Sequence, residues 1–93
     1  MAVSSEIFDM ETEQRVQAGR IERTVRRLLN PRPFAIWYMY FEGQIQFRVD
    51  SLSGQILADG RSGSRVSAIK DMSDEKLEDQ LRELLDKTRR ISS

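Results

Sequence analysis

The chain contains no cysteine and no histidine. Without cysteine it has no disulfide framework and no thiolate metal site. Without histidine it lacks the usual general base near neutral pH and the commonest transition-metal ligand. Cysteine nucleophiles, histidine-based triads and most zinc sites are therefore excluded. We predict a protein that is not an enzyme and that uses no cofactor or metal, with carboxylate-only catalysis as an alternative.

Long hydrophobic runs are also missing. The longest apolar run has eight residues, whereas a membrane-spanning helix needs about 20. The segment 1–6 has neither a basic start nor an apolar core, so it predicts no signal peptide. We expect a cytoplasmic protein with no membrane contact, made of one domain over residues 12–91 after a flexible or weakly helical segment 1–11. A small domain without disulfides or metals often completes its core by pairing, so we also expect a homodimer.

The net charge is zero, but the charges are segregated along the chain. Residues 15–32 carry six arginines and one glutamate, whereas residues 71–86 carry seven acids and two bases. A basic element and an acidic element in one small domain attract each other, or their copies in a dimer.

Helical periodicity marks the two ends of the domain. Residues 12–29 place Ala18, Ile21, Val25 and Leu28 on one stripe. The segment Asn30-Pro31-Arg32-Pro33 then ends that helix. A second helix begins near Ser73, with Ser73 or Asp71 as its N-cap. Its apolar seam consists of Leu77, Leu81, Leu84 and Ile91, with Thr88 in the fourth position.

Strand patterns fill the middle of the chain. Residues 34–41 form the first strand, Glu42-Gly43 a two-residue hairpin turn, and residues 44–50 an alternating strand that ends at a turn with Gly54 at positive φ. Residues 55–58 are a short third strand, 59–64 a mobile loop, and 65–70 a fourth strand or the lead into the last helix. The predicted fold class is α+β: an antiparallel meander of three to four strands with an N-terminal and a C-terminal helix.

The run Phe-Ala-Ile-Trp-Tyr-Met-Tyr-Phe at 34–41 holds five of the seven aromatic residues. Alternation splits it into two sets, and only one set joins the helix-facing side of the sheet. The other set is covered by the chain itself, docks a partner, or stacks nucleic-acid bases. The candidate partner-binding residues are Trp37, Tyr38, Met39, Tyr40 and Phe41.

The arginines of the first helix are the second candidate surface. Arginine forks bind carboxylates and phosphates alike, so these residues serve ion pairs to the acidic helix, an acidic protein, or nucleic acid. The candidate residues are Arg20, Arg23, Arg26, Arg27 and Arg32. A sequence pI near 6.3 is low for a nucleic-acid-binding domain.

These observations favour a non-catalytic protein-interaction module. Such a module would be a small regulator, adaptor, chaperone or inhibitor that works by occupying a partner's surface. The aromatic strand would supply the desolvated anchor, and the charged helices would orient the partner. Nucleic-acid binding through the arginines is the first alternative, and a carboxylate-only enzyme is the second.

Overall fold

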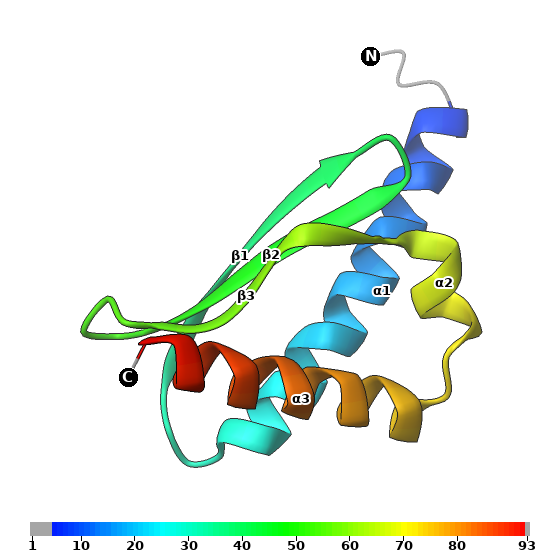
Figure 1. Cartoon of the computed structure of the whole chain (residues 1–93). Helices are drawn as coiled ribbons and strands as arrows, with labels where there is room; N and C mark the ends of the chain where they lie inside the picture. The colour runs from blue at the N-terminus through cyan, green and yellow to red at the C-terminus, as the bar shows by residue number, and fades with distance from the viewer. Residues whose placement is uncertain (1–4, 93) are drawn as a thin grey trace.

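The protein forms a three-stranded antiparallel sheet with helices on one side. The computed structural model describes the backbone of residues 5–92 and the side chains of residues 12–90. The strands form a meander in the order β1-β2-β3 (Figure 1). This architecture confirms the predicted α+β class. The elements are α1 (Ser5–Leu29), β1 (Phe34–Phe41), β2 (Gln44–Ser51), β3 (Ile56–Arg65), α2 (Val66–Asp71) and α3 (Asp74–Ser92).

The hydrophobic core lies between the sheet and the helices. The alternation of β2 places Ile45, Phe47 and Val49 on the helix side, where all three are buried. The predicted stripe of α1 and the seam of α3 cover this face, as expected from their helical spacing. The buried helical residues include Ala18, Ile21, Val25, Leu77 and Leu81.

Both predicted turns have the expected backbone. Glu42 and Gly43 have φ values of 47° and 76°, so both residues of the β1–β2 turn are left-handed. This is the geometry of a type I′ hairpin turn, whose twist matches that of the strands it joins. Gly54 follows with a φ of 93° in the β2–β3 turn. The turns therefore place β1, β2 and β3 in sequence as an up-and-down meander.

The predicted loop at 59–64 is wrong, because β3 continues through it to Arg65. Its two glycines belong to the strand for packing reasons. A Cβ on Gly60 would lie 2.5 Å from Cε1 of Phe47, so the aromatic ring needs the bare backbone there. Gly63 has a φ of 84°, and the register shifts between Ile45 and Phe47 opposite this segment. In the sequence, a glycine that a strand needs at a bulge cannot be distinguished from a glycine in a loop.

Of the two alternatives predicted for residues 65–70, the fourth strand does not form, and the segment leads into the last helix. Residues Val66–Asp71 form the short helix α2, whose Val66 and Ile69 are buried. The sheet formed by the described residues therefore has three strands. A short apolar segment fits a strand or a helix equally well by periodicity alone, and packing beneath α1 decides for the helix.

The helix ends agree with the predicted capping. The Lys76 backbone N–H donates to Ser73 Oγ at 3.2 Å, which confirms Ser73 as the cap of α3. Near the other end of α3, the Thr88 hydroxyl donates to the Leu84 carbonyl and accepts the Asp59 N–H, which ties α3 to β3. The side chain of Ile91 lies outside the described residues. At the N-terminal end, α1 begins at Ser5, inside the segment 1–11 that precedes the strong periodicity.

Candidate interaction surface

The register of the β1–β2 hairpin decides which residues of the aromatic strand face the helices. Residues directly opposite each other on paired strands share a face of the sheet. Ile36 lies opposite Val49, and Tyr38 lies opposite Phe47, so both point into the core. The intervening residues lie opposite polar positions of β2 and point away from the helices. This outward set consists of Ala35, Trp37, Met39 and Phe41.

Three large side chains of the outward set are exposed. The exposed fractions of Trp37, Met39 and Phe41 are 59%, 62% and 58%. We call these three residues the outer strip. The helices lie on the opposite side of the sheet (Figure 1), so they leave the strip uncovered. Adjacent apolar side chains exposed on one strand are typical of an interaction surface.

Polar groups border the outer strip on the side of β2 and β3. A shallow hollow of about 360 Å³ is lined by Trp37 and Met39 together with Gln46, Arg48 and Arg61. An apolar centre with a polar rim is the usual composition of a protein–protein interface. The hollow therefore gives the outer strip both a contact surface and donors that can orient a partner.

Two ion pairs form the charged part of this face. Asp59 accepts two hydrogen bonds from the Arg61 guanidinium, at 2.8 and 2.7 Å. These bonds and the Arg61 backbone N–H lower the pKa of the Asp59 carboxyl to about 2. Arg48 pairs with Asp50 at 3.0 Å. Among the described residues, Arg48 Nε and Asp50 Oδ1 are buried and have no hydrogen-bond partner.

The two tyrosines of the aromatic strand occupy the other face. The Tyr38 hydroxyl donates to the Ala18 carbonyl at 2.9 Å, which joins β1 to α1. Burial raises the pKa of Tyr38, and the nearby Glu22 carboxylate raises it further. Tyr40 stacks on Tyr38 with ring centroids 6.3 Å apart, and burial raises the pKa of Tyr40 as well. Of the five candidate partner-binding residues, the structure thus brings Trp37, Met39 and Phe41 together on the outside.

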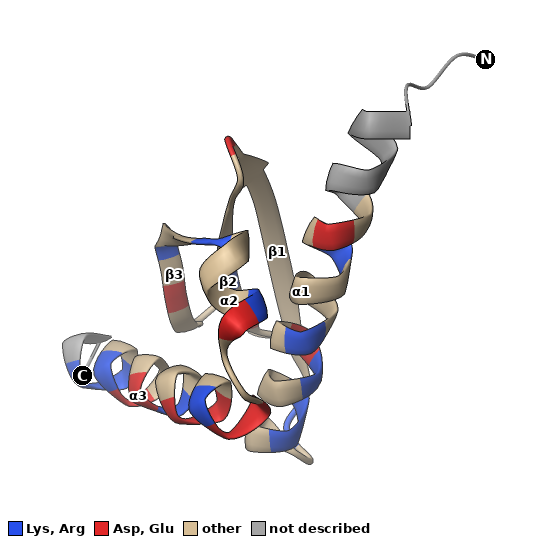
Figure 2. Ribbon diagram, turned by 90° about the vertical axis from the view of Figure 1, so that its right-hand side faces the viewer, with Lys and Arg blue, Asp and Glu red and all other residues tan. Residues whose placement is uncertain are grey.

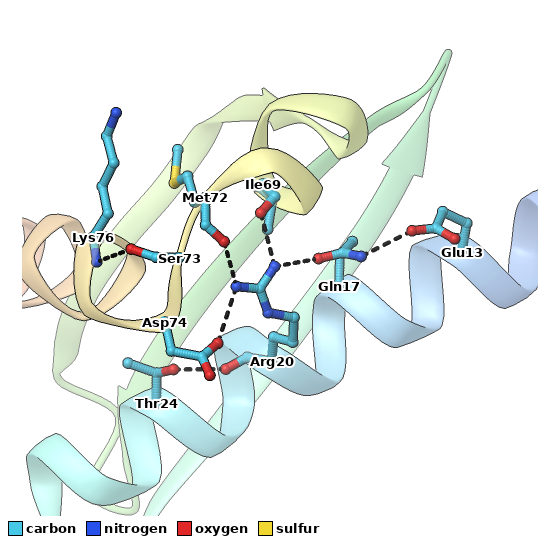
Figure 3. A network of polar contacts seen from close by, with 9 residues as sticks. All are labelled: Glu13, Gln17, Arg20, Thr24, Ile69, Met72, Ser73, Asp74 and Lys76. Carbon is cyan, nitrogen blue, oxygen red and sulfur yellow. Dashed lines mark hydrogen bonds and ion pairs between the residues drawn. The ribbon is translucent and has the colours of Figure 1, made fainter.

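Arg20 is an internal tether between helices. Its guanidinium donates to the carbonyls of Ile69 and Met72 at 2.8 and 2.7 Å (Figure 3). It also contacts Gln17 and the Asp74 carboxylate. Its side chain is only 16% exposed. The acceptors are backbone carbonyls at the end of α2, so no residue pattern in the sequence indicated this role.

The remaining candidate arginines are divided between pairing and exposure. Arg27 pairs with Glu78 of α3 at 2.9 Å, so part of the predicted attraction between basic and acidic helices occurs within one chain (Figure 2). Arg26 lies over the Phe34 ring, 5.8 Å from its centroid. Arg23 and Arg32 are exposed and have no ion pair among the described side chains. The predicted arginine surface is therefore not one continuous binding face.

The side chains described by the structure contain no group of three or more acidic residues placed to hold a metal ion. Over the described part of the chain, every helix is too short or too polar to cross a bilayer.

No protein family model matches the chain, and comparison with curated proteins and with solved structures finds no significant relative.

Proposed function

We propose that the protein is a non-catalytic interaction module that binds a partner protein through the outer strip. Such a module would be a small regulator, adaptor, chaperone or inhibitor that acts by occupying the surface of its partner. One observation carries the proposal: Trp37, Met39 and Phe41 lie side by side on one strand, each more than half exposed. The helices stabilise the fold from the other face, so covering the strip requires no rearrangement of the core.

The energetics of the outer strip favour a protein partner. Fully burying one large apolar side chain contributes roughly 1.5–3 kcal/mol. Tryptophan is also among the residues most enriched at the energetic centres of interfaces. Gln46, Arg48 and Arg61 on the rim of the hollow supply donors for a partner's carbonyl groups. A partner with an apolar centre and a carbonyl-rich margin fits this surface.

The nucleic-acid alternative has weaker support from the same geometry. Arg20 and Arg27 are engaged with other parts of the chain. The outer strip contains two aromatic rings, Trp37 and Phe41, but the paired acids Asp50 and Asp59 lie beside it. Acidic groups at the binding face oppose a phosphate backbone.

Site-specific photo-crosslinking in cells tests the proposal. A benzophenone side chain replaces Met39 on the outer strip, and in a matched control it replaces Glu83, an exposed residue of α3. We expect discrete protein adducts from position 39 and none of comparable yield from position 83. Equal, weak labelling at both positions would contradict binding through the outer strip.

Size-exclusion chromatography with light scattering tests the alternative. Absorbance at 260 and 280 nm is recorded across the peak at low and high salt. We expect a protein-like ratio that salt does not change. Nucleic-acid absorbance that disappears at high salt would instead favour binding by the arginines, because phosphate contacts weaken steeply with salt.

A further inference from the structure

We propose that this chain forms a homodimer in which two β1 strands pair antiparallel, edge to edge, into one continuous sheet. The inference rests on the proposed function, because the pairing joins the two outer strips into one larger binding surface for the partner protein. It adds the second copy that completes this surface and the way in which the two copies meet. The two molecules are related by a twofold axis that lies between the two β1 strands, level with the middle of each.

The free edge of β1 is the first observation. β1 pairs with β2 in an unbroken register over eight residues. Over residues 5–92, its other edge is paired with no strand. Natural sheet edges are protected by lysine, proline, bulges, short length or a covering element. β1 has no charged residue, no proline and no bulge, so its own sequence provides no such protection.

The hairpin turn shows which backbone groups point to this edge. A two-residue type I′ turn makes its flanking residues, Phe41 and Gln44, a hydrogen-bonded pair. Alternation then directs the N–H and C=O groups of Ile36, Tyr38 and Tyr40 away from β2. Antiparallel pairing of two such edges forms about six new hydrogen bonds. It also joins the outer strips of both copies into one larger apolar surface.

The charges at the ends of β1 favour a second copy over an unrelated strand. Glu42 is exposed just after the strand, and Arg32 is exposed two residues before it. Neither has an ion-pair partner among the described side chains. An antiparallel pair of identical strands brings Glu42 of each copy toward Arg32 of the other. Between these ends the strand is uncharged, so identical copies do not repel each other.

The alternation of side chains limits the register. Residues directly opposite must point to the same face, so outer residues pair with outer residues. Near the middle of the strand, three arrangements satisfy this rule: Trp37 opposite Trp37, Trp37 opposite Met39, or Met39 opposite Met39. In each arrangement the outer residues occupy non-hydrogen-bonded positions, where Cα atoms lie about 4.5 Å apart. That separation is within the range of a disulfide.

The absence of cysteine makes the register directly measurable. Trp37→Cys tests the first arrangement and Met39→Cys tests the third. The second places residue 35 opposite residue 41, so a mixture of Ala35→Cys and Phe41→Cys tests it while keeping Trp37 and Met39. Under mild oxidation we expect one of these samples to form the linked dimer in high yield. Gln46→Cys is the matched control, because it lies on the same face but one strand away from the edge.

A second pair of variants tests the edge hydrogen bonds in solution. Tyr40→Ala and Tyr40→Pro both remove the phenol, but only proline removes the N–H that points to the free edge. Light scattering over a dilution series gives the dimer dissociation constant of each variant. We expect the constant of Tyr40→Pro to exceed that of Tyr40→Ala by about tenfold or more. Circular dichroism of both variants verifies that the sheet remains folded.

The outcomes separate this inference from the proposed function. A monomer at all concentrations, with no linked dimer from any β1 cysteine, would overturn edge pairing. If photo-crosslinks from position 39 then reach another protein, the interaction function still stands. A linked dimer from Gln46→Cys alone would indicate packing of two outer faces, which overturns edge pairing but keeps the outer strip as the interface. No adducts and no dimer together would overturn both.

Discussion

The two faces of β1 differ in their role although they are equally apolar. Phe34, Ile36 and Tyr38 of the inward set pack against the core, and Tyr38 is hydrogen-bonded to α1, whereas Tyr40 stacks on Tyr38. The outward set, which contains the outer strip, faces away from every described helix. The difference arises because all three helices lie on one side of the sheet (Figure 1). An apolar strand therefore contributes to the core through half of its side chains and leaves three large side chains of the other half exposed.

The largest expected effect comes from deleting a side chain of the inner face. Ile45 is fully buried between the sheet and the helices. Ile45→Ala removes its contacts and leaves a cavity, so we expect a loss of about 3 kcal/mol in the free energy of unfolding. Trp37→Ser on the outer strip should change that free energy by less than about 0.5 kcal/mol. Urea unfolding at low protein concentration, where any dimer has dissociated, measures both.

The contrast between these variants can fail in a recognisable way. If Trp37→Ser destabilises the monomer as much as Ile45→Ala, the outer strip is part of the monomer core and the division into two faces is incorrect. Met39→Ser is the control, since it has a similar exposure at the neighbouring outward position. Equal, small effects of the two outer substitutions support the division.

Inward and outward positions can also be compared among the arginines of α1, where we expect a smaller change in the free energy of unfolding. Arg20→Met removes two hydrogen bonds from a charged donor to backbone carbonyls, which leaves those carbonyls without a partner. We expect a loss of about 2 kcal/mol. Arg23→Met is the matched control on the exposed side of the same helix and should be nearly neutral. Thermal unfolding of the two variants gives the difference, and equal midpoints would contradict the tether.

Much of this division was predictable from the sequence. The period of two in β2 identified Ile45, Phe47 and Val49 as the core face, and the 3.6-residue period identified the buried stripe of α1. Alternation also required half of the aromatic strand to lie outside. Alternation alone did not determine which half lies outside, because this depends on the register of the β1–β2 hairpin. The turn at Glu42-Gly43 fixes the register only once the type of turn is known.

Other features depend on tertiary contacts that leave no pattern in the sequence. Arg20 resembles its neighbours on α1, yet its acceptors are carbonyls about fifty residues further along the chain. Likewise, the glycines of β3 resemble loop residues until the Phe47 ring is placed over Gly60. The sequence thus predicted the strand that carries the candidate surface. Which of its residues are exposed, and which contacts Arg20 makes, could be determined only from the folded structure.

A substitution of Gly60 in β3 tests how closely the inner face of the sheet is packed. A Cβ there would lie 2.5–2.8 Å from three atoms of the buried Phe47 ring. We therefore expect Gly60→Ala to lower the free energy of unfolding by about 1–2 kcal/mol through overpacking. The double variant Gly60→Ala, Phe47→Leu should lose less than the sum of the two single changes, because the smaller side chain makes room. Strict additivity in denaturant unfolding would exclude the ring as the cause.

The smallest expected effect concerns the charges of the outer face. The pKa of Asp59 is lowered to about 2 by hydrogen bonds from Arg61, whereas an aspartate in an unfolded chain titrates near 4. The unfolded state therefore binds a proton more readily between these values. The stabilisation is complete above about pH 4 and is lost as the pH falls through about 2. Because Asp59 is partly exposed and Arg61 is exposed, solvent screening keeps this contribution to stability small.

Asp59→Asn isolates this contribution, and Asp79→Asn, on the exposed surface of α3, serves as the control. The free energy of unfolding of Asp59→Asn should lie slightly below that of the wild type at pH 7. The gap should close as the pH is lowered from 4 to 2, since protonated aspartate and asparagine are both neutral. A gap that stays constant over this range would show that the Asp59–Arg61 pair acts through packing. In that case Asp59 and Arg61 would stabilise the fold through van der Waals contacts, as the buried residues of the inner face do.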